Sequence, residues 1–255
     1  SRIAAEGLVA VAVDGNKGAV VEVNSETDFV AKNDMFQEYV ADAALVALMH
    51  NGEVCDMKTF QCPKVHKSFE ERLTDLIAKI GENRNLRRAA MLEVSNGVIA
   101  SYVHNACKPN LGKIGVLVAL ESNGDKAKLQ ELGKHIAMHV AASNPQFLTI
   151  ADVDQASIDH EKAIFSEQAK ASGKPENIIE KMVEGRIKKY FDEVVLEEQA
   201  YIMDPDKKVK QIVADAAKEM GADIKLKAFV CFRLGEGLEK RNEDFAAEVA
   251  SQLKK

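Results

Sequence analysis

The sequence lacks several features that mark specialised proteins. It has no tryptophan, only four cysteines in 255 residues, and no apolar run long enough for a membrane-spanning helix. We therefore expect no membrane partner. Cysteines this few and scattered disfavour a disulfide framework, so we expect free thiols in a reducing, intracellular compartment. The four cysteines are Cys55, Cys62, Cys107 and Cys231.

An excess of positive charge is also missing. The chain has 34 Lys and Arg against 40 Asp and Glu, a formal net charge of -6. Neutralising a phosphate backbone requires clustered Lys and Arg, so this balance disfavours nucleic acid as a ligand. The composition, 46% hydrophobic and 29% charged, is that of an ordinary globular protein with a sizeable core. We expect a protein or small-molecule partner, while the pattern leaves self-association undetermined.

Nucleotide-binding motifs are incomplete. The stretch "LGEGLEK" (234–240) lacks the third glycine of a dinucleotide-binding turn. The stretch "SGKPEN" (172–177) lacks the first glycine and the spacing of a Walker loop. We therefore expect no bound nucleotide and no cofactor.

Metal-binding patterns are incomplete as well. His135 and His139 are four apart, but the zinc-protease pattern needs a glutamate where Ile136 stands. Because Val140 continues an apolar face beside His139, we interpret His139 as a partly buried structural histidine. We expect no metal site and no catalytic residues. A second candidate cluster has irregular spacing and no fourth ligand: Cys55, Cys62 and His66.

What the sequence does contain is an internal repeat. Residues 8–13 and 19–24 are apolar, β-branched runs around a turn, which predicts a hairpin. An apolar helical face then runs from Phe36 to Leu48, and a second helix is expected at 69–81, capped by its final glycine. A third strand at 85–94 completes the unit.

The pattern then starts again. Strands are predicted at 98–104 and 113–121, followed by a helix whose apolar residues lie 96 positions after those of the first copy. The glycine-capped helix at 209–221 and the strand at 225–235 lie 140 positions after their counterparts. The second copy therefore contains an insertion of about a helical hairpin's length.

The inserted residues fit that interpretation. Residues 152–171 are helix-prone, "SGKP" (172–175) breaks the helix, and apolar residues then recur from Ile179 to Val194 at close to a 3.5-residue period. Ile158 and Phe165 are seven apart and suit the facing helix. We expect two antiparallel helices projecting from the body.

These observations predict an α+β protein. We expect two repeated subdomains, each with a small antiparallel sheet and packed helices, an inserted antiparallel coiled-coil hairpin, and a C-terminal helix. The expected boundaries are 1–95 for the first subdomain, 96–150 with 199–240 for the second, 151–198 for the hairpin, and 241–255 for the C-terminal helix.

The stretch "EVNSETDFVAKND" (22–34) raises a separate question, because it places Phe29 beside Asp28 in a polar, turn-prone segment. At the equivalent corner of the second copy stands a plain polar turn, 123–125, without an aromatic. This weakens the view that Phe29 plugs the core. Periodicity alone leaves a core plug and an exposed anchor both open, and an exposed aromatic on a loop is typical of an interface hot spot.

The same stretch resembles the signature of translation elongation factor Ts, the guanine-nucleotide exchange factor for elongation factor Tu. The resemblance continues through 78–93, 135–147, 172–190 and 243–249, and so covers essentially the whole chain. It stops at the amino end. The family's small helical module, which also contacts the partner, is not present in this sequence, so we expect a core fragment.

The resemblance implies how the chain works. In this family the Thr-Asp-Phe loop inserts into the partner's GTPase domain near its magnesium site, so Thr27, Asp28 and Phe29 would form the wedge. Further partner contacts implied by the resemblance are Ile80, His104 and Ile202, together with Phe245 and Val249 of the terminal helix. The alternatives are ordinary core positions for the two isoleucines, a solvated or capping role for His104, and a terminal helix packed on this chain.

The expected function is therefore nucleotide exchange on a GTPase without covalent chemistry, in the cytoplasm of a bacterium or in a bacteria-derived organelle. The alternative is a scaffolding module that uses its helical arm. An enzyme based on His135, His139 or the cysteines has no supporting group of residues.

Overall fold

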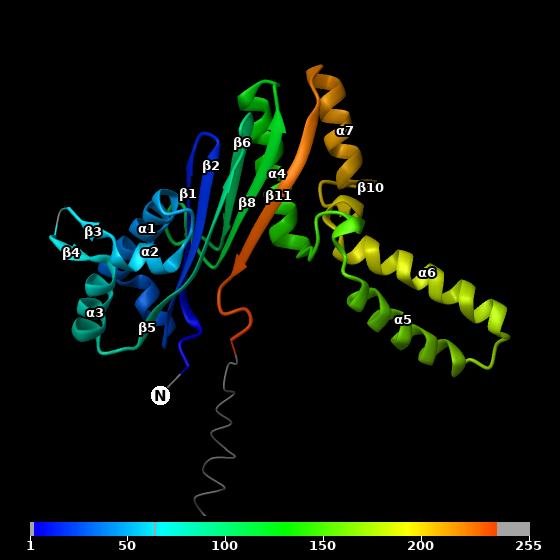
Figure 1. Ribbon diagram of the computed structural model, residues 1–255, viewed down its shortest axis with the longest axis horizontal. Coiled ribbons are helices and arrows are strands. Elements are labelled where there is room, and N and C mark those ends of the chain that lie inside the picture. Colours follow the sequence, from blue (N-terminus) through cyan, green and yellow to red (C-terminus); the bar gives the residue numbers. More distant parts are fainter. Residues whose placement is uncertain (1–2, 64, 239–255) are drawn as a thin grey trace, which may run out of the picture.

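The computed structural model describes residues 3–63 and 65–238. The predicted C-terminal helix at 241–255, with Phe245 and Val249, lies outside these residues. Within the described part, the predicted α+β class with small antiparallel sheets and packed helices is confirmed (Figure 1).

The first sheet has the strand order β5-β2-β1-β7 and is antiparallel throughout. β1 (Glu6–Asp14) and β2 (Lys17–Ser25) form the predicted hairpin, and Gly15 at its turn has a φ of 60°. β5 (Arg84–Glu93) pairs with β2. The short β7 (Leu111–Gly112) pairs with β1, although the sequence places it in the second subdomain. The predicted domain boundaries stay a prediction.

Helices cover one face of this sheet (Figure 1). The amide of Phe36 donates to the Asn33 side chain at the start of α1. Ser68 and Glu71 form a capping box on α3, which ends at Gly81 in the left-handed conformation. Local capping residues thus determine where both helices begin and where α3 ends. The elements of this layer are α1 (Asp34–Met49), α2 (Val54–Thr59), β3 (Gln61–Cys62), β4 (Lys67–Ser68) and α3 (Phe69–Ile80).

The second sheet has the order β11-β8-β6, which matches β5-β2-β1 of the first. Its strands are β6 (Gly97–His104), β8 (Ile114–Ser122) and β11 (Ile224–Arg233). α4 (Lys126–Ser143) and α7 (Val209–Met220) pack on its outer side. β11 and α7 lie 140 residues after β5 and α3, as the repeat predicts.

The two sheets face each other, with the helices outside (Figure 1). Val9, Val11 and Val20 of the first sheet meet Ile99 and Leu117 of the second in a buried cluster. The opposite face of β1 packs against α1, so β1 is buried on both sides, which explains its near-continuous apolar sequence.

The inserted helices project from the second half of the molecule (Figure 1). α5 (Gln155–Lys170) and α6 (Glu176–Val194) pack on each other and bury little beyond Ala169 and Ile187. Arg186 lies over the Phe165 ring, 5.8 Å from its centroid. The remaining elements are η1 (Asp28–Lys32), η2 (Ile150–Asp152), η3 (Leu196–Glu198), β9 (Ala200–Tyr201) and β10 (Asp204–Lys208).

Candidate partner-binding site

The corner after β2 is a short 3-10 helix, η1, that displays Phe29. The Phe29 side chain is 76% exposed, whereas Val30 and Ala31 are only 4% and 8% exposed. Both join the first core cluster, the buried apolar residues between the first sheet and the helices that cover it. Asp28 is exposed beside it. Of the two alternatives for Phe29, the core plug is wrong. The segment is anchored by the residues after the ring, and the ring itself faces solvent.

Thr27 fastens this corner to the loop that follows α3. Its hydroxyl donates to Glu82 Oε1 at 2.5 Å, and its amide donates to Glu82 Oε2 at 3.1 Å. A third bond runs the other way, from the amide of Asn83 to Glu26 Oε1 at 3.2 Å. Thr27 therefore positions the corner. Sequence reasoning missed Glu82, although it stands in the same "KIGEN" stretch as Ile80.

Ile80 lies at the end of α3, directly before this loop. It is half-buried and packs against the first core cluster, so part of its surface remains open. Gly81, with a φ of 76°, turns the chain so that Glu82 can reach Thr27. The structure thus brings Ile80 and the Thr27–Phe29 corner onto adjoining segments.

His104 is exposed at the end of β6, and Tyr102 OH lies 3.0 Å from its Nδ1. The loop that follows returns to the first half of the molecule, because Lys108 pairs with Asp34 at 3.3 Å and β7 joins β1. Asp34 is the first residue of α1, just beyond η1. His104 therefore stands on a segment tied to the Phe29 side of the molecule.

Ile202 lies elsewhere, on the turn between β9 and β10. It is 40% exposed, so the ordinary-core alternative is wrong for this isoleucine. Met203 beside it is 51% exposed, a neighbour that sequence reasoning missed. The amide of Ile202 donates to Nδ1 of His139 on α4 at 3.2 Å. His139 is fully buried, more so than predicted, and both of its ring nitrogens are occupied by hydrogen bonds.

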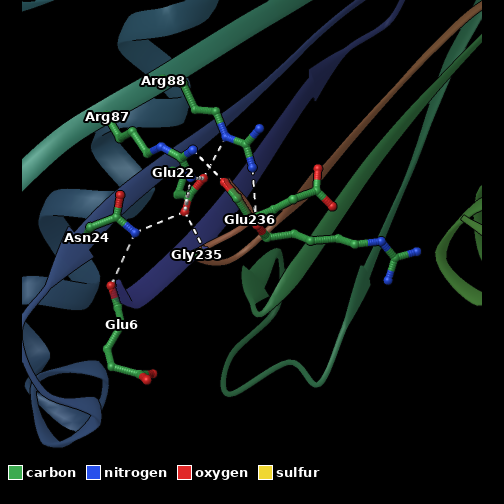
Figure 2. Close-up of polar contacts among 8 residues, drawn as sticks. Glu6, Glu22, Asn24, Arg87, Arg88, Gly235 and Glu236 are labelled. Atoms are coloured by element: carbon green, nitrogen blue, oxygen red, sulfur yellow. Dashed lines mark hydrogen bonds and ion pairs between the residues drawn. The ribbon is translucent and has the colours of Figure 1, made fainter. Parts of the chain in front are cut away.

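A buried ionic cluster is centred on Glu22 of β2, the strand that precedes the Phe29 corner (Figure 2). Glu22 on β2 is 0% exposed, and its carboxylate accepts from Arg87 at 3.1 Å and Arg88 at 2.6 Å. It also accepts from Asn24 at 2.9 Å and from the amide of Gly235 at 2.8 Å.

This cluster joins three segments distant in sequence. It ties β2 to β5 and to the chain just after β11, and the Arg88 guanidinium also lies 4.2 Å from the centroid of the Phe232 ring. A buried carboxylate is tolerated only when its lone pairs are satisfied, as they are here. No local sequence pattern indicates this cluster, because an isolated Glu in a strand usually faces solvent.

Residues 3–63 and 65–238 show neither a membrane-spanning helix nor a metal-binding cluster. In this part of the chain, no helix combines the length and apolar character that crossing a bilayer requires. Nor do three His, Cys, Asp or Glu side chains gather there in a way that could hold a metal ion. The four cysteines are free thiols.

Comparison with known proteins identifies the family. A family model described as elongation factor Ts matches residues 26–236. Proteins named elongation factor Ts from Paramagnetospirillum magneticum, Rhodospirillum rubrum and Caulobacter vibrioides are 56%, 55% and 54% identical to this chain. The matches cover 98%, 100% and 98% of this chain and 80%, 82% and 81% of those proteins. Their class is that of the translation elongation factors. The chain belongs to the elongation factor Ts family, and the resemblance inferred from the sequence is confirmed.

Proposed function

We propose that this chain is a guanine-nucleotide exchange factor that binds elongation factor Tu in its GDP-bound form and accelerates GDP release. The observation that carries the proposal is the 76% exposure of Phe29 on an anchored turn. A phenyl ring displayed to water contributes little to this chain's own core, and it gains apolar burial only when a partner covers it.

The wedge acts on how a GTPase holds its nucleotide. GDP is retained through phosphate-cradling backbone amides and a magnesium ion. Phe29 inserted between packed elements of the partner would shift one of them by a discrete step, because packed interiors do not deform continuously. Asp28 would bring negative charge close to the phosphates and disfavour them further.

A wedge must be stiff to displace a packed element. Val30 and Ala31 are buried in the first core cluster, and Thr27 is held by two hydrogen bonds to Glu82. Little conformational freedom is then lost when the partner closes around Phe29, so more of the contact energy is left to weaken GDP binding.

The exchange factor and GDP oppose each other through a reciprocal coupling free energy, so rebinding of nucleotide expels the factor. No covalent step is required, and the protein is therefore not an enzyme in that sense. The remaining proposed contacts are Ile80, His104 and Ile202, with Phe245 and Val249 beyond the described residues. We place this activity in the cytoplasm of a bacterium or in a bacteria-derived organelle.

A scaffolding role for the helical arm is the second candidate. The observation that favours it is the exposure of two isoleucines on the projecting helices, Ile164 at 38% and Ile178 at 41%. Such side chains could bind another protein without any effect on nucleotide.

The test is the release of fluorescent GDP from preloaded elongation factor Tu in the presence of excess unlabelled GDP. We expect the chain to increase the dissociation rate in a concentration-dependent manner. Binding to elongation factor Tu with no change in that rate would favour the scaffold and refute the exchange function. A variant with both Ile164 and Ile178 replaced by Ser would lose binding under the scaffold hypothesis and keep Phe29-dependent exchange under the other.

A further inference from the structure

The buried His139 has a defined protonation state. A backbone amide can only donate, so the bond from Ile202 N requires an unprotonated Nδ1. The proton is therefore on Nε2, which donates to Gln199 Oε1 at 2.8 Å. Burial lowers the pKa of His139, which favours the same neutral ring.

Gln199 fixes the orientation of that ring. Its Nε2 donates to the carbonyl of Glu193 at 2.8 Å and to that of Ser143 at 3.4 Å, which leaves Oε1 to face His139. These carbonyls belong to the last turn of α6 and the last residue of α4. The Gln199–His139 pair thus ties the base of the helical arm to the body.

The far end of this chain of hydrogen bonds is the turn that displays Ile202 and Met203. The β9 strand has only two residues and its pairing with β10 is irregular, so the ladder alone holds the turn weakly. Tyr201 stacks on the His139 ring with a centroid separation of 5.9 Å, and its hydroxyl lies 3.2 Å from Met203 Sδ. His139 therefore supports the turn in two ways. It accepts a hydrogen bond from the Ile202 backbone amide, and its ring stacks on the Tyr201 side chain.

The turn also borders a hollow that has both apolar and polar walls. Met203 lines a hollow of about 490 Å³ together with Val13, Ile99 and Met138. Met203 at this hollow and the exposed Ile202 beside it in sequence form a surface that a protein partner can bury.

We propose that His139, oriented by Gln199, is a positioning residue that fixes the Ile202–Met203 turn as an apolar contact for the GTPase partner. This inference rests on the proposed function and adds a residue to it. His139 does not touch the partner. It acts through the amide of Ile202, at a place separate from the Phe29 corner, and should therefore affect binding and leave the wedge unchanged.

Two matched substitutions separate its two hydrogen bonds. In H139N the amide oxygen lies near the position of Nδ1 and can accept from Ile202, whereas in H139Q the longer amide reaches Gln199 and leaves Ile202 without an acceptor. Hydrogen exchange of the Ile202 amide, followed by NMR, reports which bond remains. We expect protection in the parent chain and H139N, and rapid exchange in H139Q.

The functional measurement is stimulated GDP release against the concentration of elongation factor Tu·GDP. We expect H139Q to raise KM about threefold to tenfold, the effect of one lost hydrogen bond, with kcat unchanged and with H139N close to the parent. In a chain that carries both I202A and M203A, the effect of H139Q should disappear. If H139Q fails to fold, Q199M removes the acceptor that orients His139, together with the amide donors to Glu193 and Ser143, and should raise KM likewise.

Equal KM values for H139N and H139Q would overturn the inference, as would a fall in kcat or an effect that persists in the I202A/M203A chain. These outcomes require a parent chain that stimulates GDP release. A parent without that activity refutes the proposed function itself, and this inference falls with it.

Discussion

Replacement of Phe29 by Ala tests whether the exposed ring belongs to the partner's interface or to this chain's own core. Truncating a fully buried Phe costs about 3–5 kcal/mol. Because Phe29 is 76% exposed, only a minor part of that burial is present, and we expect the free energy of unfolding to fall by less than about 1 kcal/mol. Phe36 on α1 is 0% exposed, so F36A should show the full loss.

The effect of F29A on exchange should be much larger. A hot-spot side chain contributes about 2 kcal/mol or more to an interface, which corresponds to a fall in kcat/KM of roughly thirtyfold. The assay is stopped-flow release of fluorescent GDP, with urea unfolding of the same preparations. L45A is the matched control, because Leu45 is 55% exposed on α1 and has no role in the proposed site. Exchange at the parent rate, or an F29A chain as unstable as F36A, would refute the reasoning.

Three further predictions concern the supports of the site. In E82A the corner loses its clamp on Thr27, so kcat/KM for exchange should fall about threefold to tenfold while E82Q, which keeps an acceptor, retains part of the activity. The loss should be absent in an F29A background. E22Q leaves Arg87 and Arg88 without their buried counter-charge, a change that costs about 3–5 kcal/mol in a fully buried pair. Because both arginines are partly exposed, we expect the free energy of unfolding in urea to fall by about 3 kcal/mol, the lower end of that range; an unchanged urea midpoint would contradict this. Finally, the pKa of His139 is lower in the folded chain than its ordinary 6.5, so the unfolded chain binds more protons. Stability should therefore decrease as pH falls below about 6.5 towards the folded pKa, and H139N should remove this part of the pH dependence of the melting temperature.

Local signals predicted the regular elements. The glycine caps that end α3 and α7, and the matching strands β5 and β11, follow from hydrophobic periodicity and capping residues that act within a few positions. The two-residue strands could not be predicted, because a strand that short has no period. The packing of one sheet on the other also required the structure, since continuous apolar strands fit several kinds of burial.

The candidate site likewise has one part that the sequence could indicate and another that depends on the tertiary fold. The comparison of the two repeats drew attention to Phe29, but its exposure depends on where Val30 and Ala31 pack. Glu82 lies 55 residues from Thr27, and Gly235 lies 213 residues from Glu22. Partners this distant in sequence come together only through the tertiary fold, so no local pattern indicates them.

The close fit between the two sheets determines how the repeated halves fold. A Cβ atom at Gly115 would lie 2.6 Å from the Val9 side chain, which shows how little space separates β8 from β1. Each half in isolation would expose to water the apolar face that now meets its twin. Duplication has therefore produced a molecule whose halves are mutually dependent, and heating should melt them in one cooperative transition.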